Sequence, residues 1–169
     1  MKLDQDIKLN IIKCVLVTGL FFLAIPNVFA NTTLPHLLKF GDNLIQVKQQ
    51  LSKECETLTE QKLPRLLSVA SENQSLIKCQ GFEYLGSRHS IELMFSDNQL
   101  DVIQILGTAA EYDDLLNLLK QEYGTPSHSS ENVVYYQSLG ISVRTQPHNI
   151  TFVSERLVRE YSRFVNGIK

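Results

Sequence analysis

The stretch from Ile91 to Pro126 constrains the fold more than any other part of this chain, because each junction in it carries a turn or cap signal. Its first five residues alternate between apolar and other side chains, a period of two that predicts a strand with one face on a core. Residues 96–99 (Ser-Asp-Asn-Gln) predict a tight turn, since Asp and Asn tolerate left-handed backbone. In the second strand, over 100–106, the adjacent Val102 and Ile103 break the alternation and indicate either a bulge or two covered faces.

A helix is predicted directly after these strands, over residues 108–123. Thr108 and Glu111 have the spacing of a capping box, in which the hydroxyl caps a free N–H and the carboxylate reaches back. Gly124 can adopt the left-handed conformation that ends a helix, and Pro126 prevents the helix from resuming. Apolar residues recur between these ends at helical spacing: Tyr112, Leu115, Leu116, Leu119 and Tyr123.

Residues 1–30 have the pattern of a cleaved signal peptide. Lysines precede an apolar run from Cys14 to Ile25, and small residues lead to a cleavage site after Ala30. An uncleaved anchor is the alternative, although a run of about a dozen residues is shorter than the roughly 18 expected of a spanning helix. We therefore expect a periplasmic or secreted protein, residues 31–169, with no stable membrane anchor after cleavage.

Two cysteines, Cys55 and Cys79, remain after such a cleavage. An even count in an oxidising compartment predicts that they form a disulfide. Two buried free thiols and a redox pair are the alternatives, but redox cysteines are usually close in sequence, as in Cys-x-x-Cys, and these are not.

Shorter patterns predict the other elements of the chain. Asp42 is a candidate N-cap for a helix with an apolar stripe over 44–55, and Ser154 is expected to cap a last helix. Within residues 56–73, Pro64 fits the first turn of a short helix through Val69, and an extended loop is the alternative. Further strands are expected over 75–84, 133–136, 141–145 and 150–153.

These elements give the order α-βββ-α-βββ-α. The connections within each group of strands are too short for crossovers, so the strands should be antiparallel. The predicted fold is a single α+β domain over 31–169, with an antiparallel sheet of about six strands and helices packed on one face. The order also suggests two tandem units, 40–106 and 107–169.

Two segments carry a resemblance to a known family: 94–100 (Met-Phe-Ser-Asp-Asn-Gln-Leu) and 123–126 (Tyr-Gly-Thr-Pro). A hairpin of this form, followed by a helix that ends in Tyr-Gly-x-Pro, resembles small envelope domains of the β-lactamase-inhibitor-protein-like type. The resemblance implies tandem helix-plus-sheet units that serve in protein binding or envelope assembly. The chain departs from known members in lacking a lipid-attachment cysteine, and no motif carries the inhibitor's contact residues over to it.

Composition and motifs disfavour several classes of function. A net charge of −2 disfavours nucleic-acid binding, which usually requires a basic domain. The sequence contains no phosphate loop, no dinucleotide fingerprint and no Gly-x-Ser-x-Gly elbow. None of the four histidines has metal-ligand spacing or a neighbouring cysteine: His36, His89, His128 and His148. We therefore predict no catalytic, cofactor or metal residues.

Six residues are candidates for binding a partner: Tyr135, Tyr136, Arg144, Arg156, Arg159 and Arg163. The two tyrosines point to opposite faces of their strand, so one lies outside the core unless a second layer covers it, and Arg144 is expected on the neighbouring strand. The last three arginines lie on one side of the final helix, which is either a solvated face or a docking face for an acidic partner or anionic lipid headgroups.

The leading hypothesis is a non-catalytic module that binds another envelope or secreted protein. The alternative is a hydrolase with a dispersed Ser/His/carboxylate site, because such triads assemble from residues distant in sequence. A cleft that gathers His89 or His148 with a carboxylate and a serine would favour the hydrolase. A secreted effector that acts on a host is a third reading.

Overall fold

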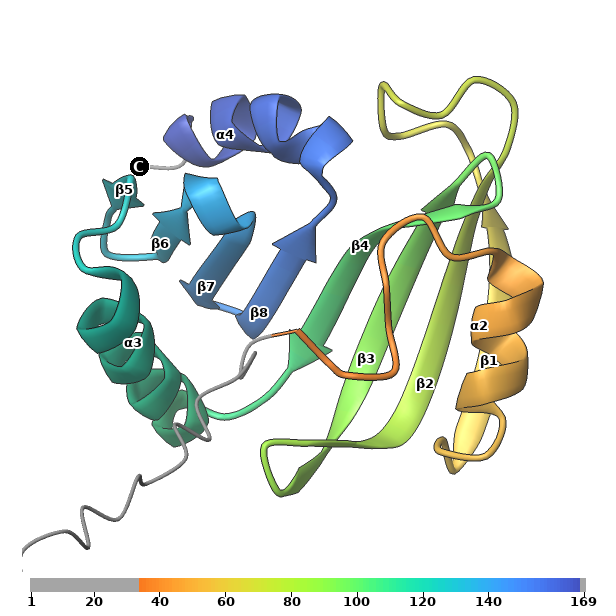
Figure 1. Cartoon of the computed structure of the whole chain (residues 1–169), viewed down its shortest axis with the longest axis horizontal. Helices are drawn as coiled ribbons and strands as arrows, with labels where there is room; N and C mark the ends of the chain where they lie inside the picture. Colours follow the sequence, from red (N-terminus) through yellow and green to blue (C-terminus); the bar gives the residue numbers. More distant parts are fainter. Residues whose placement is uncertain (1–33, 168–169) are drawn as a thin grey trace, which may run out of the picture. The chain divides into compact units, whose positions relative to one another are not determined.

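Two four-stranded meanders join edge to edge into one antiparallel sheet in the computed structural model, which describes residues 34–167 (Figure 1). The strand order is β1-β2-β3-β4-β8-β7-β6-β5, so that the meanders meet where β4 pairs with β8. The elements in chain order are α2 (Leu44–Leu51), β1 (Thr57–Leu63), β2 (Gln74–Tyr84), β3 (Ser87–Ser96), β4 (Gln99–Leu106), α3 (Ala109–Tyr123), β5 (His128–Ser129), β6 (Val133–Tyr136), η1 (Gln137–Leu139), β7 (Ile141–Thr145), β8 (His148–Val153), η2 (Glu155–Leu157) and α4 (Val158–Asn166). The predicted signal peptide, residues 1–30, lies outside the described residues.

The α+β class and the antiparallel sheet are confirmed, but the prediction of about six strands was wrong. The sheet has eight strands, and each of the first two helices is followed by four rather than three. The first missed strand is β1, within the region 56–73 that was expected as a short helix or loop. It is an edge strand whose only apolar residues, Leu58 and Leu63, do not alternate with a period of two. The second, β5, has two residues and is defined by its pairing with β6.

The sheet has an inner face, which carries the main core, and an outer face, which does not. Helices α2 and α3 cover the inner face with Val47 and Leu51 from α2 and Leu115 and Leu119 from α3. The strands contribute alternate residues to this core, including Ile77, Ile91, Leu93, Ile103, Ile105, Ile150 and Phe152.

Helix α4 lies on the outer face, over the second meander (Figure 1). Its Val165 packs against Val133 and Tyr135 of β6 in a second, smaller cluster. The prediction that the helices share one face was therefore wrong. The apolar stripe of a helix indicates that one side of it is buried, but not which face of a sheet buries it.

A bulge at Asp101 sets the register of β4. Met94 of β3 pairs with Val102, but the next residue, Phe95, pairs with Leu100, so Asp101 is the extra residue on β4. The bulge turns Leu100 to the inner face with Ile103 and Ile105, while Val102 lies on the outer face, and it confirms the first of the two explanations for the broken alternation. It also leaves the buried Asp101 side chain free to contact the end of β8.

The disulfide between Cys55 and Cys79 is confirmed, and it ties the chain just after α2 to strand β2. The predicted N-cap of α2 was off by one residue, because the Asn43 side chain, not that of Asp42, accepts a hydrogen bond from the N–H of Ile45 at 2.8 Å. Ser154 does not cap the last helix as predicted, since its hydroxyl donates to a carboxylate instead. Within residues 34–167, no helix is both long enough and apolar enough to span a membrane.

The predicted turn between β3 and β4 also anchors the loop that precedes β2. Asp97 and Asn98 have φ angles of 50° and 67°, as a two-residue hairpin of this kind requires. The Asp97 carboxylate accepts hydrogen bonds from the backbone N–H groups of Ser71, Glu72 and Asn73 at 2.8–3.0 Å. These bonds hold the pKa of Asp97 well below its ordinary value.

This geometry predicts a pH-dependent stability that Asp97→Asn removes. Because folding lowers the pKa of Asp97 below the roughly 3.9 of an unfolded chain, its carboxylate stabilises the fold above about pH 4 and loses that effect at lower pH. In urea unfolding, the variant should therefore be less stable than the wild type at pH 7, and the gap should narrow as the pH falls below about 4. Asp113→Asn, at an exposed acid of α3, is the control. A gap at Asp97 that does not vary with pH would contradict the assignment.

Candidate functional site

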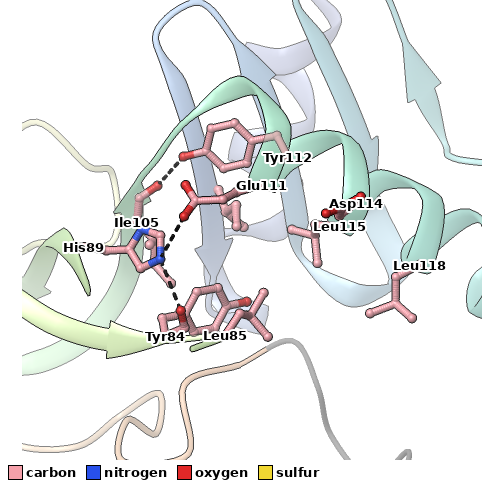
Figure 2. A pocket seen from close by; sticks show the side chains of 10 residues that line it. Tyr84, Leu85, His89, Ile105, Glu111, Tyr112, Asp114, Leu115 and Leu118 are labelled. Carbon is pink, nitrogen blue, oxygen red and sulfur yellow. Dashed lines mark hydrogen bonds and ion pairs between the residues drawn. The ribbon is translucent and has the colours of Figure 1, made fainter. Parts of the chain in front are cut away.

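A pocket of about 320 Å³ opens between α3 and the hairpin that joins β2 to β3 (Figure 2). Its apolar wall comes from Leu85, Ile105, Leu115, Leu118 and Ile150. Its polar groups come from Tyr84, His89, Glu111, Tyr112 and Asp114. Pockets of this size with an apolar lining and a few polar groups are the usual form of a ligand site.

His89 lies at the polar end of the pocket with both of its ring nitrogens engaged. Nδ1 lies 3.0 Å from the backbone oxygen of Leu106, and Nε2 lies 3.1 Å from that of Tyr84. Nε2 also lies 3.8 Å from a carboxylate oxygen of Glu111, and Figure 2 shows the two side chains facing each other. Carbonyl oxygens only accept hydrogen bonds, so a neutral ring satisfies one of them and a protonated ring satisfies both. Both ring nitrogens face backbone carbonyl oxygens and not a hydroxyl, so neither is positioned to take a proton from a nucleophile.

Glu111 is held in place by the first turn of α3. Its carboxylate accepts hydrogen bonds from the backbone N–H of Thr108 at 2.8 Å and from the Thr108 hydroxyl at 2.9 Å, as part of the predicted capping box. The backbone hydrogen bond is the main reason that the pKa of Glu111 lies below its ordinary value. The neighbouring His89 ring and the Ser87 hydroxyl lower it further. Glu111 is therefore an anchored carboxylate rather than a proton donor.

The two tyrosines of the pocket act as structural groups. The Tyr112 hydroxyl donates to the backbone oxygen of Ile105 at 3.0 Å, and its ring stacks on that of His148 with centroids 5.7 Å apart. Burial raises the pKa of both Tyr84 and Tyr112, so both remain protonated at neutral pH. They present aromatic surface to the pocket and no reactive oxygen.

The pocket thus brings together His89 and Glu111, and Ser87, outside its lining, contacts the Glu111 carboxylate, so the residue types that a dispersed hydrolase would need lie close together. The geometry does not make them a catalytic set, because the Ser87 hydroxyl bonds to the carboxylate and not to the imidazole. Sequence reasoning singled out His89 but missed Glu111 as its neighbour, although the capping-box pattern had placed Glu111 on the first turn of α3. What the pocket offers chemically is an apolar cavity with one fixed carboxylate at its edge.

The structure buries both tyrosines that were predicted to bind a partner. Tyr136 belongs to the inner core, and Tyr135 lies on the outer face beneath α4, where its hydroxyl is 3.2 Å from that of Ser162. The sequence predicted that one of the two tyrosines would lie outside the core unless a second layer covered it, and helix α4 is that layer. Neither tyrosine presents surface to a partner.

Arg156 was also predicted as a partner contact, and the structure gives it a role within the fold. Its Nε and one terminal nitrogen bind the two oxygens of Asp101 at 2.6 and 2.5 Å, and the same terminal nitrogen binds the backbone oxygen of Ser96 at 3.1 Å. The Ser154 hydroxyl also donates to Asp101. The Asp101 side chain is 1% exposed, so this cluster neutralises a buried charge where β4 meets the end of β8.

The other three predicted arginines are distributed over two surfaces. Arg159 and Arg163 are exposed on α4, consistent with either a solvated or a docking face. Arg144 lies on β7 and is half-buried on the outer face, in the groove beside α4. No set of three or more His, Cys, Asp or Glu side chains within residues 34–167 is placed to hold a metal ion.

The outer face of the first meander carries two parallel rows of side chains. Thr59, Lys78, Glu92 and Gln104 are directly paired across β1 to β4 and make a polar row. An ion pair of 2.8 Å joins the Lys78 and Glu92 side chains at its centre. Beside it runs an apolar row of Leu76, Met94 and Val102, paired across β2 to β4. We call these two rows together the sheet surface.

Comparison with known proteins places the chain in a family. Residues 36–164 match a family model whose description is "Uncharacterised protein". No curated protein and no solved structure matches the chain. The description names no activity, ligand or partner, so the likeness to β-lactamase-inhibitor-protein-like domains stays a prediction.

The Asp101 cluster predicts that Arg156→Gln destabilises the fold. Removing the guanidinium leaves a buried carboxylate without its countercharge, which should lower the free energy of unfolding by roughly 3 kcal/mol. Arg159→Gln, at an exposed arginine of the same helical segment, should change it by less than about 0.5 kcal/mol. Chemical denaturation of both variants measures the difference, and equal effects would contradict the role assigned to Arg156.

Proposed function

The chain belongs to this family of uncharacterised proteins, and we propose that it is an exported, non-catalytic module that binds another envelope or secreted protein. The observation that carries the proposal is the sheet surface. Stable protein interfaces combine an apolar centre with a polar rim, and the adjacent apolar and polar rows have this composition. The strand register holds both rows in fixed positions, so little side-chain and backbone order has to be gained on binding.

The environment of the sheet surface supports the same reading. Thr59, Gln61, Lys78 and Gln80 are exposed there, and α4 packs on the second meander instead. One solvated face is common in antiparallel sheets, so exposure alone would not single it out. The distinguishing feature is the apolar row within that polar face, with Met94 and Val102 half-buried.

Export is part of the proposal. The disulfide between Cys55 and Cys79 supports an oxidising compartment, since such bonds persist mainly in the periplasm or outside the cell. The signal-peptide pattern of residues 1–30 supports the same destination. These two features together support a periplasmic or secreted location.

A swap of charges tests the sheet surface. Lys78→Glu combined with Glu92→Lys keeps the ion pair and the net charge but reverses the charge pattern that a partner meets. The tagged protein is expressed in its own cells, captured after crosslinking, and its partners are identified by mass spectrometry. We expect a recurrent partner whose recovery falls at least about tenfold in the swapped variant, as like charges meet across the interface.

A second ion pair provides the matched control. Lys48 of α2 and Glu60 of β1 lie 2.6 Å apart, and the swap Lys48→Glu with Glu60→Lys makes the same change away from the sheet surface. This variant should capture the partner as well as the wild type does. Equal capture by both swapped variants, or the absence of any recurrent partner from well-expressed samples, would contradict the proposal.

A hydrolase is the second candidate, because the pocket holds His89 and the Glu111 carboxylate, which Ser87 contacts. Turnover of a panel of p-nitrophenyl esters by the wild type and by Ser87→Ala decides between the two. We expect no turnover that depends on Ser87, since its hydroxyl faces the Glu111 carboxylate and not the His89 imidazole. Hydrolysis that the Ser87→Ala change abolishes would overturn the non-catalytic assignment.

A further inference from the structure

A second cavity, of about 390 Å³, lies on the outer face between α4 and the loop that joins β1 to β2. We call it the outer groove. Its floor is formed by Met94, Val102, Gln104, Arg144 and Thr151 of four strands, and its walls by Leu66 and Leu67 of the loop and by Leu157, Glu160, Tyr161 and Phe164 near or on α4. Ser68 of the loop donates its N–H and its hydroxyl to Glu160, which fixes one wall to the other.

Arg144 forms no ion pair with the acid that lines this groove or with any other acid within residues 34–167. Its Nε is buried and has no hydrogen-bond partner among those residues. Glu160, the acid that lines the groove, is engaged by Ser68. A half-buried cation without a carboxylate is unfavourable, and an anionic ligand group would relieve this cost.

A neutral donor lies beside Arg144. Asn149 pairs directly with it across β7 and β8, is fully buried, and its Nδ2 also lacks a partner. Its Oδ1 accepts a hydrogen bond from the Thr151 hydroxyl at 3.3 Å. Whichever way the Asn149 amide is turned, the guanidinium remains without an ion-pair partner within residues 34–167. Asn149 does not line the groove, so Arg144 is the group there that an anion would contact.

The rest of the groove has the mixed character of a peptide site. Leu66 and Phe164, exposed by 61% and 54%, flank it and can contact apolar side chains of a ligand. Gln104 and Thr151 on the floor can hydrogen-bond to the amide groups of a peptide. The hydrocarbon chain of a lipid has no groups that could form such bonds. The charge and the lining together favour a peptide with a free carboxylate over an acyl chain.

We propose that the outer groove binds the C-terminal end of a partner polypeptide, with the terminal carboxylate on Arg144 and the last apolar side chains between the loop and α4. This inference rests on the proposed protein-binding function and gives it a specific recognition element. The groove adjoins the apolar row of the sheet surface through Met94 and Val102, so one partner can occupy both.

The test uses fluorescein-labelled six-residue peptides with Gly-Ser-Gly followed by three apolar residues drawn from Leu, Ile, Val and Phe. Each peptide is made with a free C-terminal carboxylate and with a C-terminal amide. In fluorescence anisotropy with the purified protein, the free acids should bind at least about tenfold more tightly, because only a free carboxylate forms a charged hydrogen bond with Arg144. Arg144→Gln should remove this preference.

Arg163→Gln is the matched control, since Arg163 is exposed on α4 outside the groove lining. Its binding should equal that of the wild type. Equal affinity for acids and amides, a preference that survives Arg144→Gln, or no binding by any peptide would overturn the proposal. Binding of dodecanoate, with the same dependence on Arg144 and without peptide binding, would assign the groove to acyl chains instead. If peptide binding fails while partner capture still depends on the Lys78 and Glu92 swap, the groove inference fails and the proposed function stands.

Discussion

The pairing of β4 with β8 is the interaction on which the rest of the structure depends. It joins the two meanders into one sheet, and the alternation of side chains along these strands fixes which residues of both halves face inward. We call this β4–β8 pairing the seam. One end of it is held by Asp101, whose backbone and side-chain oxygens accept hydrogen bonds from Ser154 and whose carboxylate binds Arg156. At the other end, the N–H of Gly107 donates to the backbone oxygen of His148. A slip by one residue would exchange the core with the outer face.

The two strands of this seam carry a different cavity on each face of the sheet. The inner pocket lies between the sheet and α3, where His89 links the ends of β2 and β4 to the first turn of the helix. The outer groove and the sheet surface lie on the opposite face, where Arg144 forms no ion pair within residues 34–167. At the inner site His89, Glu111 and Tyr112 are engaged within the fold, whereas at the outer site the Arg144 Nε has no hydrogen-bond partner.

The sequence predicted the parts of the fold that are encoded locally. The hairpin at Asp97 and the ends of α3 depend on residues close together in the chain, and their patterns were sufficient, whereas the pattern in β4 allowed a bulge as one of two explanations. Edge strand β1 was missed because most of its side chains are exposed. Such a strand can form without the alternation of apolar and polar residues by which strands are predicted. The role of Arg156 was missed because its partner, Asp101, lies 55 residues away, and no periodicity encodes such a contact.

The central claim is that a partner binds the outer face, and site-specific photocrosslinking in the protein's own cells tests it most directly. A photoreactive residue replaces Gln80, which is exposed on β2, or Gln50, which is exposed on α2. The account predicts a discrete crosslinked partner from position 80 and none from position 50. Crosslinks of equal yield at both positions, or crosslinks from position 50 alone, would contradict it.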